Sequence, residues 1–225
     1  MTTAAVKIST VGDFLGKLIE VSAEPYQVES HDNNPKYAKR LEYFKREFKA
    51  TGMDLIPASF LDYCTKYSFQ HVKKGLFFFG GTGTGKTSRA VFIKNTFGIK
   101  LQIANILFEA YKTDGPEYAL ELSKVSLNNR LDSYSPFSED LIIDELGAEP
   151  ASANIFGTTC YPLAEIIEQR YLMFSRHGAL THFTSNKSLP EMREVYGERA
   201  FSRLNEMCYK PIGITGNDRR IVKTA

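Results

Sequence analysis

Residues 80–87, Gly80-Gly81-Thr82-Gly83-Thr84-Gly85-Lys86-Thr87, fit the pattern G-x-x-x-x-G-K-[ST] at every fixed position. The stretch follows the apolar run 76–79 and precedes a helical pattern over 88–97, which is the strand-loop-helix setting that this motif requires. Glycines let successive backbone N–H groups turn inward around phosphate oxygens, and the next helix adds the positive end of its dipole. A flexible glycine turn would explain the glycines but not Lys86 and Thr87. We therefore expect a nucleotide-binding loop.

The side chains of this loop predict the cofactors. Lys86 would reach the β and γ phosphates of a nucleoside triphosphate, and the Thr87 hydroxyl would bind Mg²⁺. We therefore expect ATP and Mg²⁺ as cofactors, and Lys86 also as a catalytic residue. The expected nucleotide-binding positions are Gly80, Gly81, Thr82, Gly83, Thr84, Gly85, Lys86, Thr87 and Ser88.

A second motif, Asp140-Leu141-Ile142-Ile143-Asp144-Glu145, is an apolar strand that ends in two acids, as a Walker B segment does. Ligands of parallel α/β sheets collect beyond the carboxyl ends of the strands, so both acids should emerge at the edge that carries the loop. Two acids at a strand end are commonly no more than a solvated turn. Beside the loop, we expect Asp144 to hold Mg²⁺ and Glu145 to polarise the attacking water. Asp140 is expected at the surface, at the strand start.

From about residue 57 onward, apolar runs alternate with helical patterns, which is typical of an α/β fold with a parallel sheet covered by helices on both faces. We predict a nucleotide-binding core over 57–225 and an N-terminal helical appendage over 1–56 that binds a partner or DNA. The predicted strands cover 76–79, 101–106, 141–143, 180–184 and 211–214. The predicted helices cover 88–97, 106–129 as one or two helices, 161–174 and 189–207.

Within the appendage, Tyr37, Leu41, Phe44 and Phe48 recur at helical spacing, with six basic residues on the remaining turns between 36 and 49. This pattern predicts a basic amphipathic helix. The helix would either pack on the core with a solvated charged face, or offer a docking or nucleic-acid surface.

The bulk composition narrows the class of protein. The 225 residues are 43% hydrophobic and 24% charged, which argues against wholesale disorder, and the net charge of +2 permits contact with nucleic acid without requiring it. The cysteines, Cys64, Cys160 and Cys208, lack metal-ligand spacing and are expected to be reduced packing residues. Without an apolar run of about 20 residues or a signal pattern, we expect a cytoplasmic protein that contacts no membrane.

Two further segments, His182-Phe183-Thr184-Ser185-Asn186 and Tyr196-Gly197-Glu198-Arg199-Ala200-Phe201-Ser202-Arg203-Leu204-Asn205-Glu206-Met207, carry a family resemblance. Together with the two motifs, these segments resemble the AAA+ ATPases of the DnaC and IstB type. These are replicative helicase loaders and transposase helper ATPases. Residues 146–150 and 162–171 are weaker matches to the same family. The resemblance covers roughly residues 57–222.

The resemblance implies roles for three catalytic residues. Asn186 corresponds to sensor 1, which orients the lytic water, although it could instead be a plain strand cap. Arg203 is the first choice for the arginine finger and Arg199 the second, supplied by a neighbouring subunit to offset charge on the γ phosphate. The alternative for both is a salt-bridged helix face. Arg219 and Arg220 are candidates for sensor 2, and we expect no C-terminal lid domain after the last strand.

By this resemblance, the leading hypothesis is an ATP-hydrolysing helicase loader that forms a homo-oligomer with ATP and contacts single-stranded DNA and a replicative helicase. An IstB-like transposition helper would instead bind duplex DNA and a transposase. A third hypothesis is a nucleotide-regulated scaffold with little hydrolysis. A small-molecule kinase is a weaker alternative, since no acceptor pocket or lid can be located in the sequence.

Overall fold

The computed structural model describes residues 34–52, 58–123, 140–216 and 218. Within these residues, five strands form one parallel sheet in the order β2-β3-β6-β1-β7. They are β1 (Phe77–Phe79), β2 (Lys100–Ile103), β3 (Leu141–Leu146), β6 (Thr181–Ser185) and β7 (Ile212–Gly213). The predicted α/β class with a parallel sheet is therefore confirmed.

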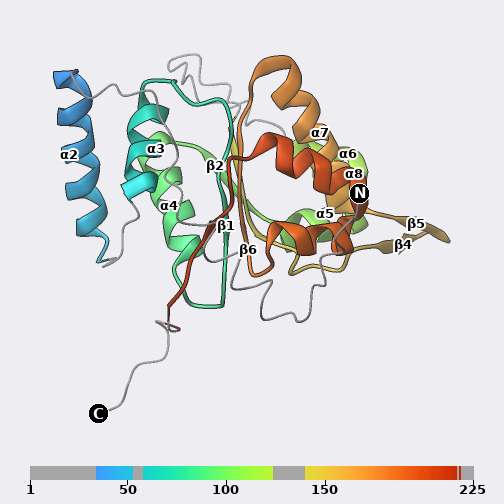
Figure 1. Ribbon diagram of the computed structural model, residues 1–225. Helices are drawn as coiled ribbons and strands as arrows, with labels where there is room; N and C mark the ends of the chain where they lie inside the picture. Colours follow the sequence, from blue (N-terminus) through green and yellow to red (C-terminus); the bar gives the residue numbers. More distant parts are fainter. Residues whose placement is uncertain (1–33, 53–57, 124–139, 217, 219–225) are drawn as a thin grey trace, which may run out of the picture.

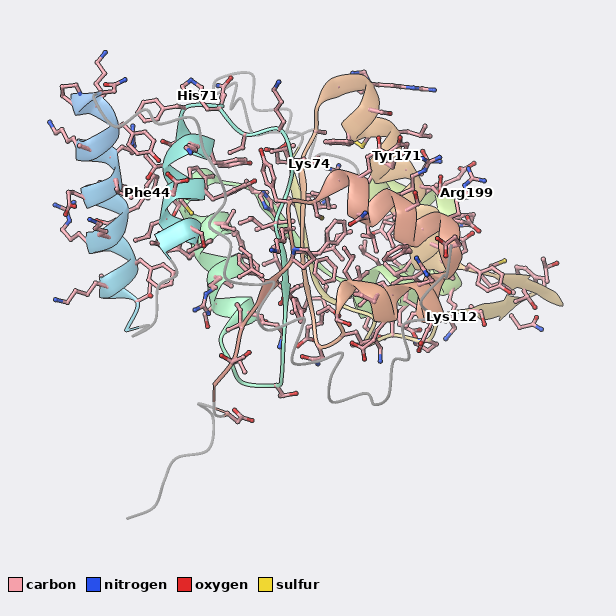
Figure 2. All side chains as sticks on the ribbon, viewed as in Figure 1. Phe44, His71, Lys74, Lys112, Tyr171 and Arg199 are labelled. Carbon is pink, nitrogen blue, oxygen red and sulfur yellow. The ribbon has the colours of Figure 1, made fainter. Side chains whose placement is uncertain are left out.

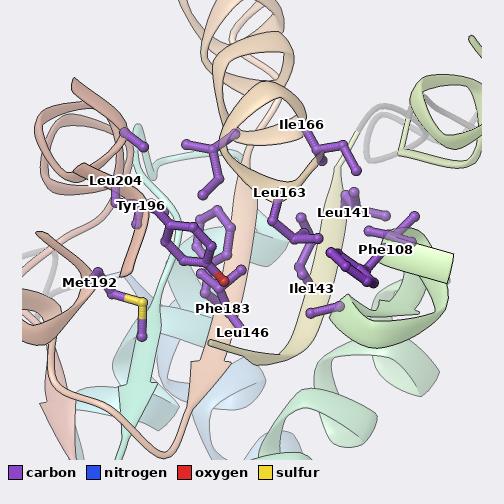
Figure 3. Close-up of a cluster of buried hydrophobic side chains, with 14 of the residues drawn as sticks. Phe108, Leu141, Ile143, Leu146, Leu163, Ile166, Phe183, Met192, Tyr196 and Leu204 are labelled. Carbon is purple, nitrogen blue, oxygen red and sulfur yellow. The ribbon is translucent and has the colours of Figure 1, made fainter. Parts of the chain in front are cut away.

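Helices cover both faces of this sheet, as predicted (Figure 1). Alternate residues of a strand point to opposite faces, so Phe78 and Ile142 enter one core while Phe77 and Ile143 enter the other. The first core is closed by α2 (Pro35–Ala50), α3 (Ala58–Ser68) and α4 (Lys86–Phe97). The second, drawn in Figure 3, is closed by α5 (Ala104–Asp114), α6 (Pro116–Ser123), α7 (Pro162–His177) and α8 (Leu189–Met207).

Helix α2 is the predicted amphipathic helix. It begins after Asn34, whose side chain accepts a hydrogen bond from the Lys36 backbone N–H at 2.9 Å, a normal helix cap. Phe44 and Phe48 are buried against α4. The ring centre of Phe44 lies 5.7 Å from that of Phe97, and the ring centre of Phe48 lies 5.1 Å from that of Phe92. The helix therefore packs on the core with its basic residues outside. Residues 1–33 of the proposed appendage lie outside the described residues.

The structure also contains elements that the sequence did not predict. Helix α3 precedes β1. Between β3 and α7 in the chain, β4 (Ala153–Ile155) and β5 (Thr158–Cys160) form a hairpin that projects outward from the molecule (Figure 1). The hairpin turn, Phe156-Gly157, has positive φ at both residues, and phenylalanine is a rare choice there, so the usual turn signal is missing.

Several predicted boundaries move as well. Strand β2 ends at Ile103, three residues before the predicted end, because α5 begins at Ala104. Helix α4 begins at Lys86, two residues early, and β3 continues to Leu146. The described part of the helical stretch predicted up to 129 ends with α6 at Ser123.

The expectation that Asp140 lies at the surface is wrong. This residue is 8% exposed, and its carboxylate accepts hydrogen bonds from the Leu180 backbone N–H at 2.7 Å and from the Tyr67 hydroxyl. Burial and the neighbouring Asp140 raise the pKa of Tyr67, which keeps its hydroxyl protonated as a donor. Asp140 therefore ties the start of β3 to β6 and α3, at the opposite end of β3 from the two acids.

None of the helices within the described ranges is long and apolar enough to cross a bilayer. The three cysteines are free thiols, and Cys64 and Cys208 are buried as packing residues. Burial raises the pKa of both thiols. Cys160, on the hairpin, is partly exposed.

Candidate functional site

The loop after β1 has the backbone that a phosphate nest needs. Gly80, Gly83 and Gly85 have φ values of 144°, 74° and 95°, which side-chain-bearing residues rarely adopt. Gly85 caps α4, whose first helical residue is Lys86, so the free N–H groups of the helix start open directly into the loop. The loop and the helix start together have the backbone geometry that binds anions in other proteins.

Two of these glycines are also required by close contacts. A Cβ on Gly80 would collide with the backbone oxygen of Ile214, and one on Gly83 with the Asp218 carboxylate. The segment that follows β7 therefore packs directly against the loop. Arg219 and Arg220, the sensor 2 candidates, come next in the chain but lie outside the described residues.

Lys86 fills the centre of the loop. Its side chain is buried, and Nζ donates hydrogen bonds to the backbone oxygens of Gly80 at 2.8 Å and Gly81 at 2.7 Å. These carbonyl groups hold the ammonium within the loop. A bound phosphate would offer the same ammonium a charged acceptor, which makes a stronger hydrogen bond than a neutral carbonyl.

A cluster of oxygen-bearing side chains closes the mouth of the loop. Asp144 is 3% exposed, and its Oδ1 accepts hydrogen bonds from Thr87 Oγ1 at 3.2 Å and from the Thr184 hydroxyl. The structure thus brings the two predicted metal ligands, Thr87 and Asp144, together. It adds Thr184 of β6, which the sequence did not assign to the site.

This donor set fits Mg²⁺. The cation takes hard oxygen ligands and usually keeps several waters, so it is bound by one or two protein oxygens together with substrate phosphates. Thr87 and Asp144 supply one hydroxyl and one carboxylate beside the loop. Among the residues described, no group of three or more His, Cys, Asp or Glu side chains could hold a metal without such help.

Glu145 lies on a bulge at the carboxyl end of β3. Ile143 pairs with Phe183 and Leu146 with Ser185, so Asp144 and Glu145 together stand opposite the single residue Thr184. Glu145 has φ +61°, and its backbone N–H donates to Thr184 Oγ1 at 3.0 Å. The bulge turns the Glu145 side chain outward, where it is exposed, while Asp144 stays buried.

Asn186 follows β6 directly and is exposed. Because β6 lies between β1 and β3 in the sheet, Asn186 emerges between the loop and the acid pair. The preceding Ser185 fixes this end of the strand, since its hydroxyl donates to the Leu146 oxygen at 2.6 Å and accepts from the Lys187 N–H at 2.9 Å. The predicted sensor residue and the predicted acids therefore share one edge of the sheet.

Arg199 and Arg203 both belong to α8, which packs against α7. Figure 2 labels Arg199. The Arg199 guanidinium contacts both carboxylate oxygens of Glu168, at 2.9 Å and 3.2 Å, and its side chain is 78% exposed. The Arg203 guanidinium lies 4.0 Å from the ring centre of Tyr171, and its side chain is 30% exposed. Neither arginine is brought to the loop of its own chain.

Glu149, in the turn after the acid pair, is a further residue whose place the sequence did not define. Its carboxylate accepts hydrogen bonds from the Gly147 N–H at 3.1 Å and from the Tyr196 hydroxyl of α8. Burial raises the pKa of Glu149, and the hydrogen bonds from Tyr196 and the backbone oppose that rise. The turn that follows Glu145 is thereby fastened to the helix that carries Arg199.

Comparisons with known proteins give distant structural similarities. A crystal structure of DnaI has a TM-score of 0.44 and 21% identity, with 89% of this chain and 93% of that chain covered. A putative primosome component from Streptococcus pyogenes has a TM-score of 0.47 and 18% identity over 84% of each chain. NtrX from Brucella abortus in complex with ATP has a TM-score of 0.37 and 14% identity, over 92% of this chain and 51% of that chain.

No family model matches the chain, and no curated protein matches it. At these TM-scores the structural similarities assign no function, so a function has to be argued from the geometry of the site.

Proposed function

We propose that this chain binds Mg²⁺-ATP in the loop of residues 80–87 and hydrolyses it to ADP and phosphate. The observation that carries the proposal is the hydrogen bond of 3.2 Å between Thr87 Oγ1 and Asp144 Oδ1, which puts a hydroxyl and a carboxylate at the mouth of the loop. Bound Mg²⁺ would neutralise charge that develops on the phosphate oxygens.

The remaining groups of the edge then take separate roles. Lys86 would hold the β and γ phosphates, and Glu145, exposed on its bulge, would polarise the attacking water. Asn186 would orient that water from the end of β6. These roles use only groups at this edge of the sheet. A cation that offsets charge on the γ phosphate is still needed.

That cation would come from a neighbouring subunit in a homo-oligomer formed with ATP. A planar guanidinium in this role is worth on the order of 10³ or more in rate. The sequence placed Arg203 first, but its guanidinium lies on Tyr171 and near Glu168 and Glu206, at 3.8 Å and 3.9 Å. Arg199 contacts Glu168 and is the more exposed of the two arginines. Surface pairs contribute about 0–1 kcal/mol and exchange easily, so exposure favours Arg199.

The finer proposal is an ATP-dependent helicase loader that contacts single-stranded DNA and a replicative helicase. Its support is the motif resemblance over residues 57–222 and the exposed basic face of α2. That face consists of Lys36, Lys39, Arg40, Lys45, Arg46 and Lys49. A basic face of this kind binds a phosphate backbone with an affinity that falls as salt is raised.

Measured turnover of the full chain tests the enzymatic proposal. Phosphate release from Mg²⁺-ATP, with single-stranded DNA and helicase present, should fall by about 10²–10⁴-fold in Glu145→Gln while ATP binding persists. Lys86→Ala should lose both binding and hydrolysis. Glu194→Gln, an exposed acid in the first half of α8, serves as the matched control and should behave as wild type. Equal, negligible turnover in wild type and Glu145→Gln would leave only the nucleotide-regulated scaffold.

DNA preference separates the loader from the transposition helper. A labelled single-stranded oligonucleotide and the matching duplex are compared in fluorescence anisotropy at low and raised salt, with and without ATP. A loader prefers the single strand and co-elutes with its helicase, whereas an IstB-like helper prefers the duplex and its transposase. Failure to bind the single strand or the helicase would exclude the loader.

A further inference from the structure

A patch of basic side chains lies at the amino ends of the strands, opposite the phosphate loop. Strands β6, β1 and β7 are neighbours in the sheet, and a segment with basic residues precedes each of them. Because these strands are parallel, the three segments lie side by side at one edge of the sheet. The basic patch consists of His71, Lys73 and Lys74 before β1, Arg176 and His177 before β6, and Lys210 before β7. Figure 2 shows His71 and Lys74 at the top of the view.

Backbone contacts join the three segments. The Lys73 N–H donates to the Tyr209 hydroxyl at 3.2 Å, and the Tyr209 N–H donates to the Gly75 oxygen at 3.0 Å. Gly75 lies so close to the start of β6 that a Cβ on it would collide with the Thr181 backbone oxygen. The backbone that carries the basic patch is therefore held in one arrangement.

Acids do not neutralise the basic patch. The chain has 26 Asp and Glu against 28 Lys and Arg, yet none of the three segments contains an acid. Within the described ranges, no carboxylate lies within ion-pair distance of Lys73, Lys74 or Arg176. Farther along α2, by contrast, Lys45 pairs with Glu42 at 2.6 Å. The basic patch therefore concentrates positive charge on a molecule that is nearly neutral as a whole.

Ordinary structural roles account for only part of the patch. Arg176 and His177 lie in the last turn of α7, where basic side chains complement the negative end of the helix dipole. Lys73 and Lys74 lie outside the helices, between α3 and β1, so this role does not explain them. A ligand that carries several negative charges explains all of these positions together.

An aromatic ring borders the patch on the side of α2. Phe69 is half-buried, with the Arg40 guanidinium 5.9 Å and the His71 ring centre 6.0 Å from its ring centre. Sites for single-stranded nucleic acids combine cations that meet the phosphates with aromatic rings on which bases stack. This combination favours a single strand over a duplex, whose bases are already stacked on one another.

We propose that the basic patch binds the phosphate backbone of a single-stranded nucleic acid. Strand β1 has the patch before its start and the phosphate loop after its end. At about 3.3 Å per residue, the extended chain from Gly75 to Gly80 spans about 17 Å, so the strand binds without competing with ATP. The inference rests on the loader proposal for its partner and deepens it, because it gives the DNA a site apart from the outer face of α2. It does not depend on hydrolysis.

Fluorescence anisotropy of the full chain with a labelled oligothymidylate tests the proposal over a series of salt concentrations. Each phosphate contact to a single strand contributes about −0.7 to the slope of log affinity against log salt. The triple variant Lys73→Ala/Arg176→Ala/Lys210→Ala should bind about tenfold or more weakly at low salt, with a slope reduced in magnitude by about two. A matching duplex should bind more weakly than the single strand to wild type.

A charge-matched control removes three exposed basic residues from other surfaces. The variant Lys94→Ala/Lys112→Ala/Arg193→Ala has the same net charge as the patch variant and should keep the wild-type affinity and slope. Mg²⁺-ATP binding, measured by calorimetry without DNA, should be unchanged in both variants. Their unfolding midpoints in urea check that both fold.

The outcomes separate this inference from the proposed function. Wild type that hydrolyses ATP but binds no single strand at low salt would refute the loader and the basic patch together and leave the ATPase intact. Wild type that binds the strand, with equal affinities in the patch and control variants, would overturn the patch assignment alone. Equal affinity for the duplex would overturn the single-strand assignment. A patch variant that keeps the strand but no longer co-elutes with the helicase would also overturn the proposal, because the patch would then be a protein surface.

Discussion

Asp144 is the residue at which the loop and the sheet meet. One of its carboxylate oxygens accepts from Thr87, at the start of α4, and from Thr184, in the middle strand β6. If Thr87 turns its oxygen toward Mg²⁺, Thr184 still holds the carboxylate in place. Thr184 also accepts the Glu145 N–H, so a single hydroxyl orients both acids of the bulge.

Thr184→Val should therefore impair hydrolysis without disturbing the core, since valine has nearly the same shape as threonine. Partners that orient a metal ligand are typically worth about 10–100-fold in metal affinity or activity. We expect a loss of this size in turnover, together with a higher Mg²⁺ concentration at half-maximal rate. A Mg²⁺ titration of ATPase activity measures both, with Thr159→Val on the exposed hairpin strand as control. An unchanged titration curve would show that Thr184 does not support the site.

The sequence could identify Lys86, Thr87 and Asp144 because their chemistry lies in short motifs whose spacing is local. Thr184 could not be assigned in the same way. Its contact with Asp144 depends on the register between β3 and β6, strands that are distant in the chain, and on a bulge that shifts this register. The pairing of two strands cannot be inferred from the residues of either strand alone.

At the scale of elements, α8 is two helical pieces joined at Gly197. This residue has φ 81° and ψ 170°, a conformation that is essentially restricted to glycine. The first piece ends at Tyr196, which is bonded to Glu149, and the second carries Arg199. The sequence predicted the helical stretch 189–207 but not its kink, because a single glycine inside a helical pattern is often tolerated.

Gly197→Ala should destabilise the protein by about 1–3 kcal/mol, the cost of a side-chain residue in this region of φ and ψ. A Cβ at this position would meet no atom within 4 Å, so the loss comes from the backbone and not from a clash. Urea unfolding monitored by circular dichroism gives the free energy. Asn205→Ala, at an exposed position of the same helix, should stay within about 0.5 kcal/mol of wild type. A Gly197→Ala protein as stable as wild type would mean that the kink is not fixed.

At the scale of the whole molecule, the face of the sheet that α3 covers buries a titratable group. His182 of β6 is 1% exposed, and its Nδ1 accepts the Leu76 N–H at 3.2 Å. Burial, and to a smaller extent Arg170, lower the pKa of His182 to about 3. The unfolded chain, with a histidine pKa of about 6.5, therefore takes up a proton in acid that the folded chain refuses.

The stability that neutral His182 contributes is present above pH 6.5 and is lost as the pH falls from there toward 3. We expect a loss of about 2 kcal/mol in unfolding free energy between pH 7.5 and pH 5 from this residue. Urea unfolding at both pH values measures the loss. His182→Asn keeps an acceptor for Leu76 but cannot titrate, so its stability should fall less over the same interval. Equal falls in the two proteins would contradict the assignment.

Arg199 lies on α8, apart from the loop of its own chain (Figure 2). A site that needs this arginine is therefore complete only between two subunits. Lys86→Ala disables nucleotide binding in a subunit's own loop. Arg199→Ala removes the guanidinium that the subunit supplies to its neighbour. Each variant alone should therefore be inactive. In an equal mixture, a site is intact where an Arg199→Ala subunit supplies the loop and a Lys86→Ala subunit supplies the arginine. Random assembly gives this arrangement at about a quarter of the head-to-tail interfaces. Phosphate release should recover to about that fraction. Arg203→Ala, mixed with Lys86→Ala in the same way, tests the competing assignment. Arg176→Ala is the surface control. Light scattering first establishes that the variants assemble with ATP; assembly without recovery would place the finger on another residue.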